Sequence, residues 1–238
     1  MKRDQWLLLG GAALLVIALV VVWSFLGGGL PSLERPGDAQ SHYQAGKAAS
    51  DKGDLTTAIA EFEQAIKLQP DYVDAYYALG VAYTNQGQTY VQNSQLPEAG
   101  AAYGQAIAAY QKVIELEPNK ADAYINLGNV YIQVGQLDQA IATLRRAVEI
   151  APNDPDAHYN LGAAYQFNEQ YDEAIAEFQK VLELKSDYAN AYLGLGYAYK
   201  EKGTKDQAIQ AFETFLKLNP DPAYRQQAEE QLAALKGS

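Results

Sequence analysis

The chain has no cysteine among its 238 residues. Disulfide bonds, thiolate metal sites, a cysteine nucleophile and a lipid-modified cysteine are therefore excluded. Basic residues are also scarce, since 18 lysines and arginines stand against 29 aspartates and glutamates and leave a net charge of −11. Nucleic-acid binders normally carry a basic stripe, and none is present here, so we expect no nucleic-acid partner.

Residue patterns that carry chemistry are equally sparse. The chain has two histidines, His42 and His158, without acidic ligands at metal spacing, so packing roles are favoured over a metal site. Gly194-Leu195-Gly196 lacks the third glycine and the preceding strand of a dinucleotide fingerprint. The acidic residues are scattered over predicted helix starts and solvent faces rather than paired. We therefore predict a protein that is not an enzyme and holds no cofactor and no metal.

Charges are also missing from residues 6–26, a run of 21 residues. As a helix this run would be about 31 Å long, close to the roughly 30 Å hydrocarbon core of a bilayer. Lys2 and Arg3 precede it, and a tryptophan lies near each end, where amphipathic rings favour the interface. We predict a flank at 1–5 and a transmembrane signal anchor at 6–26, with a cytoplasmic N-terminus and the remaining chain outside, in a periplasm or at the cell surface.

A cleaved signal peptide is the alternative for this segment. The apolar region of a signal peptide usually has about 7–15 residues, which is shorter than this run. Gly27 and Gly29 still fit a cleavage site near Gly29, after which the protein would be secreted. In either case the glycine, proline, serine and charged residues of 27–38 are typical of a flexible linker.

The rest of the chain is rich in internal repetition. From Gly128 onward the glycines of a Leu-Gly-x-x-Tyr pattern are 34 residues apart, whereas Gly80 and Gly128 are 48 apart, which is 34 plus 14. The pattern occurs four times, beginning at Leu79, Leu127, Leu161 and Leu195. Self-similarity at a fixed period indicates stacked units that bury their apolar faces against their neighbours.

Each unit is predicted to be a helix–turn–helix. In residues 121–154, Leu127 and Tyr131 lie on one helical face, Gly135 suits a C-terminal cap, and a second amphipathic stretch ends before Pro152. This pattern resembles the tetratricopeptide repeat. The resemblance implies an all-α fold, here a right-handed superhelical array with a C-terminal capping helix, preceded by one transmembrane helix. We place five repeats at 39–72, 73–120, 121–154, 155–188 and 189–222, and the capping helix and tail at 223–238.

The second repeat is 14 residues longer than the others. The insertion, at about 87–100, divides into seven residues before the turn and seven after it. Seven residues are close to two helical turns, so both helices can lengthen without rotating their apolar faces. This predicts a long protruding hairpin, and the alternative is a surface loop over 86–97. Insertions of this kind often mark a binding edge.

In the family, certain positions of each first helix line a concave groove that binds a partner polypeptide. The residues at these positions here are Tyr43, Lys47, Tyr77, Val81, Asn85, Ile125, Asn126, Asn129, Gln133, Tyr159, Asn160, Phe167, Leu193, Tyr197 and Lys200. Because the middle repeats offer asparagines without bases, the family's clamp for a terminal carboxylate is incomplete. We predict an aromatic and amide groove for a protein or peptide segment. The alternative is that these tyrosines only cover the inner surface.

The functional prediction is a non-enzymatic scaffold or assembly factor that is anchored in the membrane and binds a partner polypeptide in the groove. The anchor would raise the local concentration of the docked partner at the membrane. The array is expected to be a monomer or weak homo-oligomer. Two alternatives remain open: a cytoplasm-facing co-chaperone or adaptor, and a non-catalytic accessory subunit of a membrane enzyme complex.

Overall fold

The computed structural model describes residues 38–218 and 222–237, so the predicted transmembrane segment at 6–26 lies outside the described residues. Within them, every regular element is an α-helix. No helix in this part of the chain is long and apolar enough to cross a membrane. The all-α class predicted from the repeats is confirmed for the described residues.

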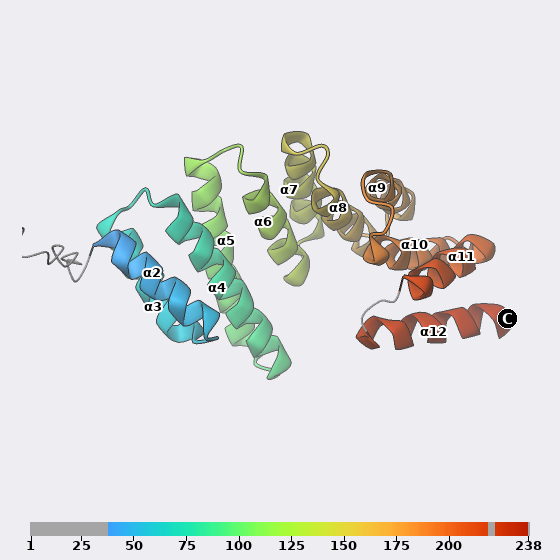
Figure 1. Ribbon diagram of the computed structural model, residues 1–238, viewed down its shortest axis with the longest axis horizontal. Helices are drawn as coiled ribbons and strands as arrows, with labels where there is room; N and C mark the ends of the chain where they lie inside the picture. The colour runs from blue at the N-terminus through green and yellow to red at the C-terminus, as the bar shows by residue number, and fades with distance from the viewer. Residues whose placement is uncertain (1–37, 219–221, 238) are drawn as a thin grey trace, which may run out of the picture.

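Ten of the described helices form five consecutive pairs that stack side by side into an arch (Figure 1). In each pair we name the earlier member the first helix and the later member the second helix. The pairs are α2 Ala39–Asp51 with α3 Leu55–Leu68, α4 Val73–Gln92 with α5 Leu96–Leu116, α6 Ala121–Gln133 with α7 Leu137–Ile150, α8 Pro155–Phe167 with α9 Tyr171–Leu184, and α10 Ala189–Glu201 with α11 Lys205–Lys217, followed by α12 Pro222–Gly237.

Aspartate side chains cap the start of some of these helices, and residues with positive φ follow the end of others. The Asp38 and Asp54 carboxylates accept hydrogen bonds from backbone N–H groups in the first turns of α2 and α3, which satisfies donors that have no partner inside the helix. Gly135, predicted as a helix cap, follows α6 with φ of 73°. Ser94 and Glu169 adopt the same left-handed conformation without being glycine, which costs about 1–3 kcal/mol each.

The core of each pair forms where a glycine of the first helix meets a large side chain of the second. A Cβ atom on Gly128 would lie 2.4 Å from Cγ of Leu144, and one on Gly162 would lie 2.8 Å from the Phe178 ring. The absence of a side chain therefore lets the two helices approach closely. Leu144 and Phe178 are fully or almost fully buried at these crossings.

The first helices lie on the inner side of the arch. α8 contacts both α6 and α10, whereas no comparable contact joins two second helices among the described residues. Elements on the inside of a curved stack lie closer together than those outside, so the second helices form the outer side. Figure 1 shows this arrangement most clearly from α6 to α9.

The insertion in the second repeat is a long hairpin rather than a loop. α4 has 20 residues against 13 in α6, and α5 has 21 against 14 in α7, so each helix is seven residues longer. Tyr103 packs on Gly87 in the same way that Tyr110 packs on Gly80, one heptad away. The added turns therefore repeat the apolar register, and their tip projects beyond the neighbouring helices (Figure 1).

The capping helix α12 packs against α11. Ala228 is fully buried in a cluster with Phe212 and Phe215, and Lys236 Nζ lies 2.7 Å from Glu213 Oε1. Leu232 and Leu235 of α12 also join this cluster. Tyr224 instead remains 47% exposed.

Tyr103 provides a stability test inside the hairpin. Its hydroxyl is buried without a hydrogen-bond partner among the described residues, whereas Tyr110 has the polar side chain of Thr84 near its hydroxyl. Because an unpaired buried hydroxyl costs roughly 1–3 kcal/mol, Tyr103→Phe should leave the free energy of unfolding unchanged or raise it by about 1 kcal/mol. The matched Tyr110→Phe change should lower it by about 1 kcal/mol. Urea titrations that show equal losses for both variants would contradict this account.

Candidate partner-binding face

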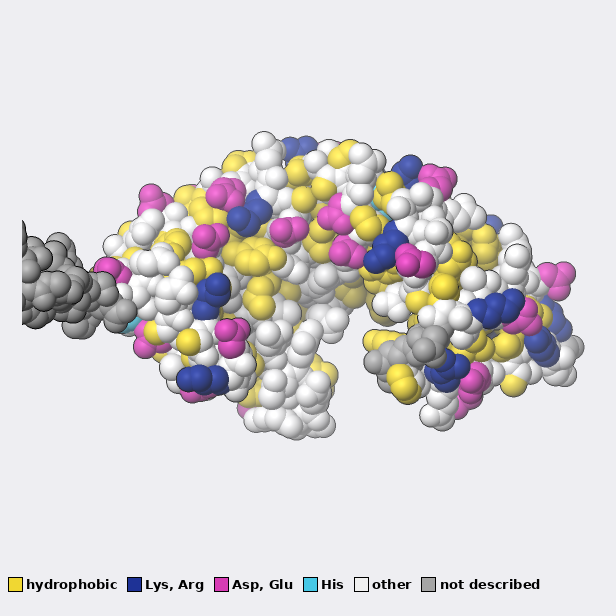
Figure 2. Space-filling model, in the orientation of Figure 1, with side chains coloured by type: hydrophobic (Ala, Val, Ile, Leu, Met, Phe, Trp, Pro, Cys, Tyr) yellow, Lys and Arg dark blue, Asp and Glu magenta, His cyan; other side chains and the backbone are white. Residues whose placement is uncertain are grey.

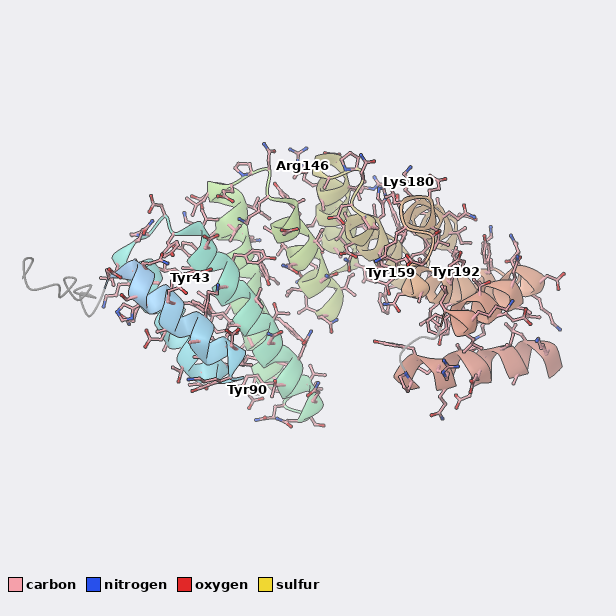
Figure 3. The ribbon with its side chains drawn as sticks, in the orientation of Figure 1. Tyr43, Tyr90, Arg146, Tyr159, Lys180 and Tyr192 are labelled. Carbon is pink, nitrogen blue, oxygen red and sulfur yellow. The ribbon has the colours of Figure 1, made fainter. Side chains whose placement is uncertain are left out.

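All fifteen residues predicted to line the groove lie on first helices, and we call the surface that they share the inner face. It borders the hollow of the arch between the α4–α5 hairpin and α12 (Figure 2). Arg146 and Lys180 lie on second helices at the opposite, outer side (Figure 3). The repeat pattern thus places all fifteen candidates on the helices that form the inner side of the arch.

Tyr77 is held by contacts from three directions. Asn126 Nδ2 donates a 2.7 Å hydrogen bond to the Tyr77 hydroxyl, the Lys120 ammonium lies 5.8 Å from the ring centroid, and the ring meets Tyr110 edge-on. Burial raises the pKa of Tyr77, and the negative charge of Asp122 adds to this shift. The result is a neutral, fixed tyrosine–amide pair that bridges the second and third repeats.

Tyr43 has a similar setting at the N-terminal end of the array. Its ring centroid lies 6.0 Å from that of Phe62 and 5.1 Å from that of Tyr72, and the Lys47 ammonium lies 5.7 Å from the ring centroid. Burial, and then the charge of Asp74, raise the pKa of Tyr43. Lysine ammonium groups therefore pack over two of the inner tyrosines, a favourable cation–π arrangement.

Two more tyrosines lie on the inner face in the last two repeats. Tyr159 packs between Phe178, at 5.8 Å, and Tyr188, at 5.3 Å. Tyr197 meets the ring of Phe212 edge-on at 5.3 Å. Both tyrosines are half-buried, and burial raises the pKa of each. Their rings are therefore fixed by the core while one side remains open to solvent.

The remaining candidates differ in how much surface they offer. Phe167 is 65% exposed, and the Asn85 and Gln133 amides are also exposed. Val81, Asn129, Asn160 and Lys200 are half-buried, and Asn160 donates to the backbone oxygen of Asp156 in its own helix. Ile125 and Leu193 are 8% and 9% exposed and belong to core clusters. These two present little surface to a partner.

Sequence reasoning missed two tyrosines that connect the end of a repeat to the first helix of the same repeat. Tyr188 donates a 2.8 Å hydrogen bond to Asp156 Oδ1, and Tyr72 donates to Gln40 in the same relation, 32 residues apart. Both tyrosines immediately precede a first helix. The repeat period was the signal that could have identified them, because they occupy the same position in their units.

The outer side carries charges that neutralise one another. Lys112, Arg146 and Lys180 recur every 34 residues, and each pairs with a glutamate three residues later, at 2.7, 2.8 and 2.9 Å.

His158 of α8 is hydrogen-bonded within its own repeat, to Glu177 Oε2 at 2.6 Å and to the backbone oxygen of Pro152 at 3.0 Å. Within the part of the chain that the structure describes, no group of three or more histidine, aspartate or glutamate side chains is placed to hold a metal.

Family comparison agrees with this architecture. A family model described as TPR repeat matches residues 46–87, 102–135, 128–169 and 168–203, and a second, Tetratricopeptide repeat, matches 189–222. The chain belongs to the tetratricopeptide repeat family. Members of this family are generally non-catalytic. The matches leave out residues 88–101, which form the tip of the α4–α5 hairpin.

Several solved structures share the fold. A crystal structure of MamA has 29% sequence identity and a TM-score of 0.63, over 73% of this chain and 94% of that one. MamA from Desulfovibrio magneticus RS-1 has 25% identity and a TM-score of 0.62, over 76% and 92% of the two chains. YrrB, described as a TPR protein with an unusual peptide-binding site, has 24% identity and a TM-score of 0.62, over 83% and 94%. No curated protein matches this chain significantly.

Proposed function

We propose that this protein is a binding scaffold that holds a segment of a partner polypeptide on its inner face, and that residues 6–26 attach it to a membrane. The observation that carries the proposal is the row of half-exposed tyrosines at positions 43, 77, 159 and 197, each fixed by aromatic packing. Rigid aromatic side chains provide contact area at a low cost in conformational entropy.

Amide groups complement these rings. Asn85, Gln133 and the half-buried Asn129 line the same face, and an amide donates and accepts hydrogen bonds at once, as an extended or helical peptide backbone requires. Proteins with this repeat act as interaction scaffolds, and the YrrB structure, by its description, contains a peptide-binding site. That description supports a polypeptide partner for the inner face here.

Site-specific photo-crosslinking in cells tests the inner face. A photoreactive residue replaces Phe167 or Gln133, which are exposed on first helices, and matched positions are Ala142 and Ala176, exposed on second helices. We expect one partner to be crosslinked from both inner positions and from neither outer position. Adducts of a partner from the outer positions alone would overturn the proposal.

The membrane attachment rests on the sequence of residues 2–26 and gives its own prediction. Because Lys2 and Arg3 precede the apolar run, the N-terminus should stay in the cytoplasm and the repeats should face outward. Protease added to intact cells or spheroplasts should therefore degrade the repeats while a cytoplasmic marker survives. Protection of the repeats until the membrane is broken would instead support the cytoplasm-facing adaptor. Mass spectrometry of the N-terminus separates an anchor from a cleaved signal.

A further inference from the structure

The α4–α5 hairpin stands out because its surface has almost no charge. Residues 75–111 contain one charged residue, Glu98, whereas 20% of the whole chain is charged, so these 37 residues would carry about seven at the average frequency. The projecting tip accordingly shows almost no charged side chain in Figure 2. Depletion of charge is the compositional mark of interface centres on protein surfaces.

Two glycines in the hairpin have no role inside the molecule. Seven of the described glycines face a side chain that a Cβ would strike at under 3.0 Å, namely Gly46, Gly80, Gly87, Gly128, Gly162, Gly194 and Gly196. Gly53, Gly135 and Gly203 have positive φ. Apart from Gly237 near the end of α12, only Gly100 and Gly104 in the described residues have neither constraint, since nothing lies within 4 Å of their Cβ positions.

Gly100 and Gly104 lie in the interior of α5, four residues apart and therefore on one face of the helix. Glycine is the least favourable helix residue after proline, so both weaken α5 without any packing gain within the protein. Glycines at this spacing on a helix surface allow the backbone of a second helix to approach closely, as in other helix pairs built on small residues.

The surroundings of the two glycines suit such a contact. Leu96 is 66% exposed and Val91 is 45% exposed at the tip, and amide side chains stand at positions 86, 88, 92, 93, 95 and 105 of the same hairpin. Apolar, small and amide groups thus form one uncharged surface on a helix pair that projects from the array.

We propose that this surface binds a second copy of the same chain, with α5 packed antiparallel against α5 of the copy at Gly100 and Gly104. Amides are both donors and acceptors, so they can pair with themselves across a twofold axis, which charged groups of one sign cannot do. With a net charge of −11, two copies repel each other elsewhere. The hairpin offers contact without juxtaposed like charges.

The consequence is a pair of arches joined at their hairpins, with both inner faces left open. Such a dimer presents two inner faces to one partner or to two, which raises apparent affinity when both can be engaged. Self-association does not depend on the proposed function, because the inner face and the hairpin tip use different residues. Either proposal can therefore fail without the other.

Cysteine crosslinking tests the contact in the full chain, which has no native cysteine to interfere. In an antiparallel dimer centred between the glycines, Gly100 of one copy lies opposite Gly104 of the other. A mixture of Gly100→Cys and Gly104→Cys chains should form a covalent dimer under mild oxidation, since a disulfide needs Cα atoms about 4.4–6.8 Å apart. Ala142→Cys, exposed on α7, is the matched control: it keeps the proposed contact but should form no covalent dimer.

A dimer from either single variant would also support contact between the two α5 helices, at a shifted register. If the mixture and both single variants crosslink no faster than Ala142→Cys, the proposal is overturned. Sedimentation of the full chain gives a second measurement that is independent of oxidation.

In that measurement, Gly104→Glu places a charge on the contact, and Ala142→Glu places the same charge on α7. We expect Gly104→Glu to weaken dimerisation at least about tenfold, while Ala142→Glu leaves it unchanged. Glutamate is the better helix former, so the melting temperature of Gly104→Glu, compared with the parent at a concentration at which both are monomeric, should not fall. This comparison separates lost association from unfolding. Equal dimerisation of the two variants, or a monomeric parent chain at all concentrations, would refute the hairpin contact.

Discussion

Replacing Gly128 with leucine is expected to destabilise the array by roughly 2 kcal/mol or more, because the new side chain enters a filled crossing. A Cβ atom alone would lie 2.4, 2.8 and 3.0 Å from three carbons of the Leu144 side chain, and Leu144 is fully buried. The gain in helix propensity, about 0.8 kcal/mol, opposes this cost but does not reach it. Urea denaturation followed by circular dichroism measures the difference.

Gly104→Leu is the matched control for this prediction. It makes the same replacement in α5, where nothing in the same chain lies within 4 Å of the Cβ position. At concentrations at which the chain is monomeric, the helix-propensity gain should therefore remain as a stabilisation of up to about 0.8 kcal/mol. Shortening the opposing side chain in a Gly128→Leu, Leu144→Ala double variant should recover part of the loss, because the two residues share one volume. A free energy of unfolding for Gly128→Leu within about 0.5 kcal/mol of the parent would show that the crossing can open.

The features that sequence predicted well are those governed by local periodicity. The glycine of the Leu-Gly-x-x-Tyr pattern lies at the crossing of the two helices in each repeat where it occurs, as at Gly128. The hairpin followed from a 14-residue excess, because seven residues in each helix preserve the apolar face. Gly87 and Tyr103 repeat the packing of Gly80 and Tyr110 one heptad away, so the core contacts of the hairpin also follow the seven-residue period.

The features that sequence missed depend on contacts between distant residues. Asn126 bonds to Tyr77 across 49 residues, and nothing in a single repeat indicates that pair. Leu193 was assigned to the groove from its position, yet it is buried in a cluster that also includes Ala228 of α12. Ser94 and Glu169 adopt positive φ although neither is a glycine, the residue from which such a conformation is normally predicted.

The double change Tyr159→Ala and Tyr197→Ala should abolish capture of the partner identified by crosslinking. Truncation of a buried aromatic anchor typically costs about 2 kcal/mol or more, so two such losses weaken binding by roughly a thousandfold. Both rings also pack on core phenylalanines, and some stability is therefore lost. The control is Tyr159→Phe with Tyr197→Phe, which retains the packing, and helicity should be followed by circular dichroism for both variants.

Deletion of residues 88–101 is the complementary change. It joins Gly87 to Ala102. Gly87, seven residues after Gly80, then takes the position that Gly135 holds seven residues after Gly128. Gly135 has positive φ, and a glycine at this position can adopt it. The shortened repeat should therefore fold. Capture is compared at concentrations at which the parent chain is monomeric, so that loss of the hairpin contact between copies does not change it. Loss of capture in the tyrosine variant alone then assigns the partner to the inner face, and loss in the deletion alone assigns it to the hairpin. If both variants keep their helicity and bind the partner as the parent does, the partner binds neither the inner face nor the hairpin, which leaves the outer side of the second helices.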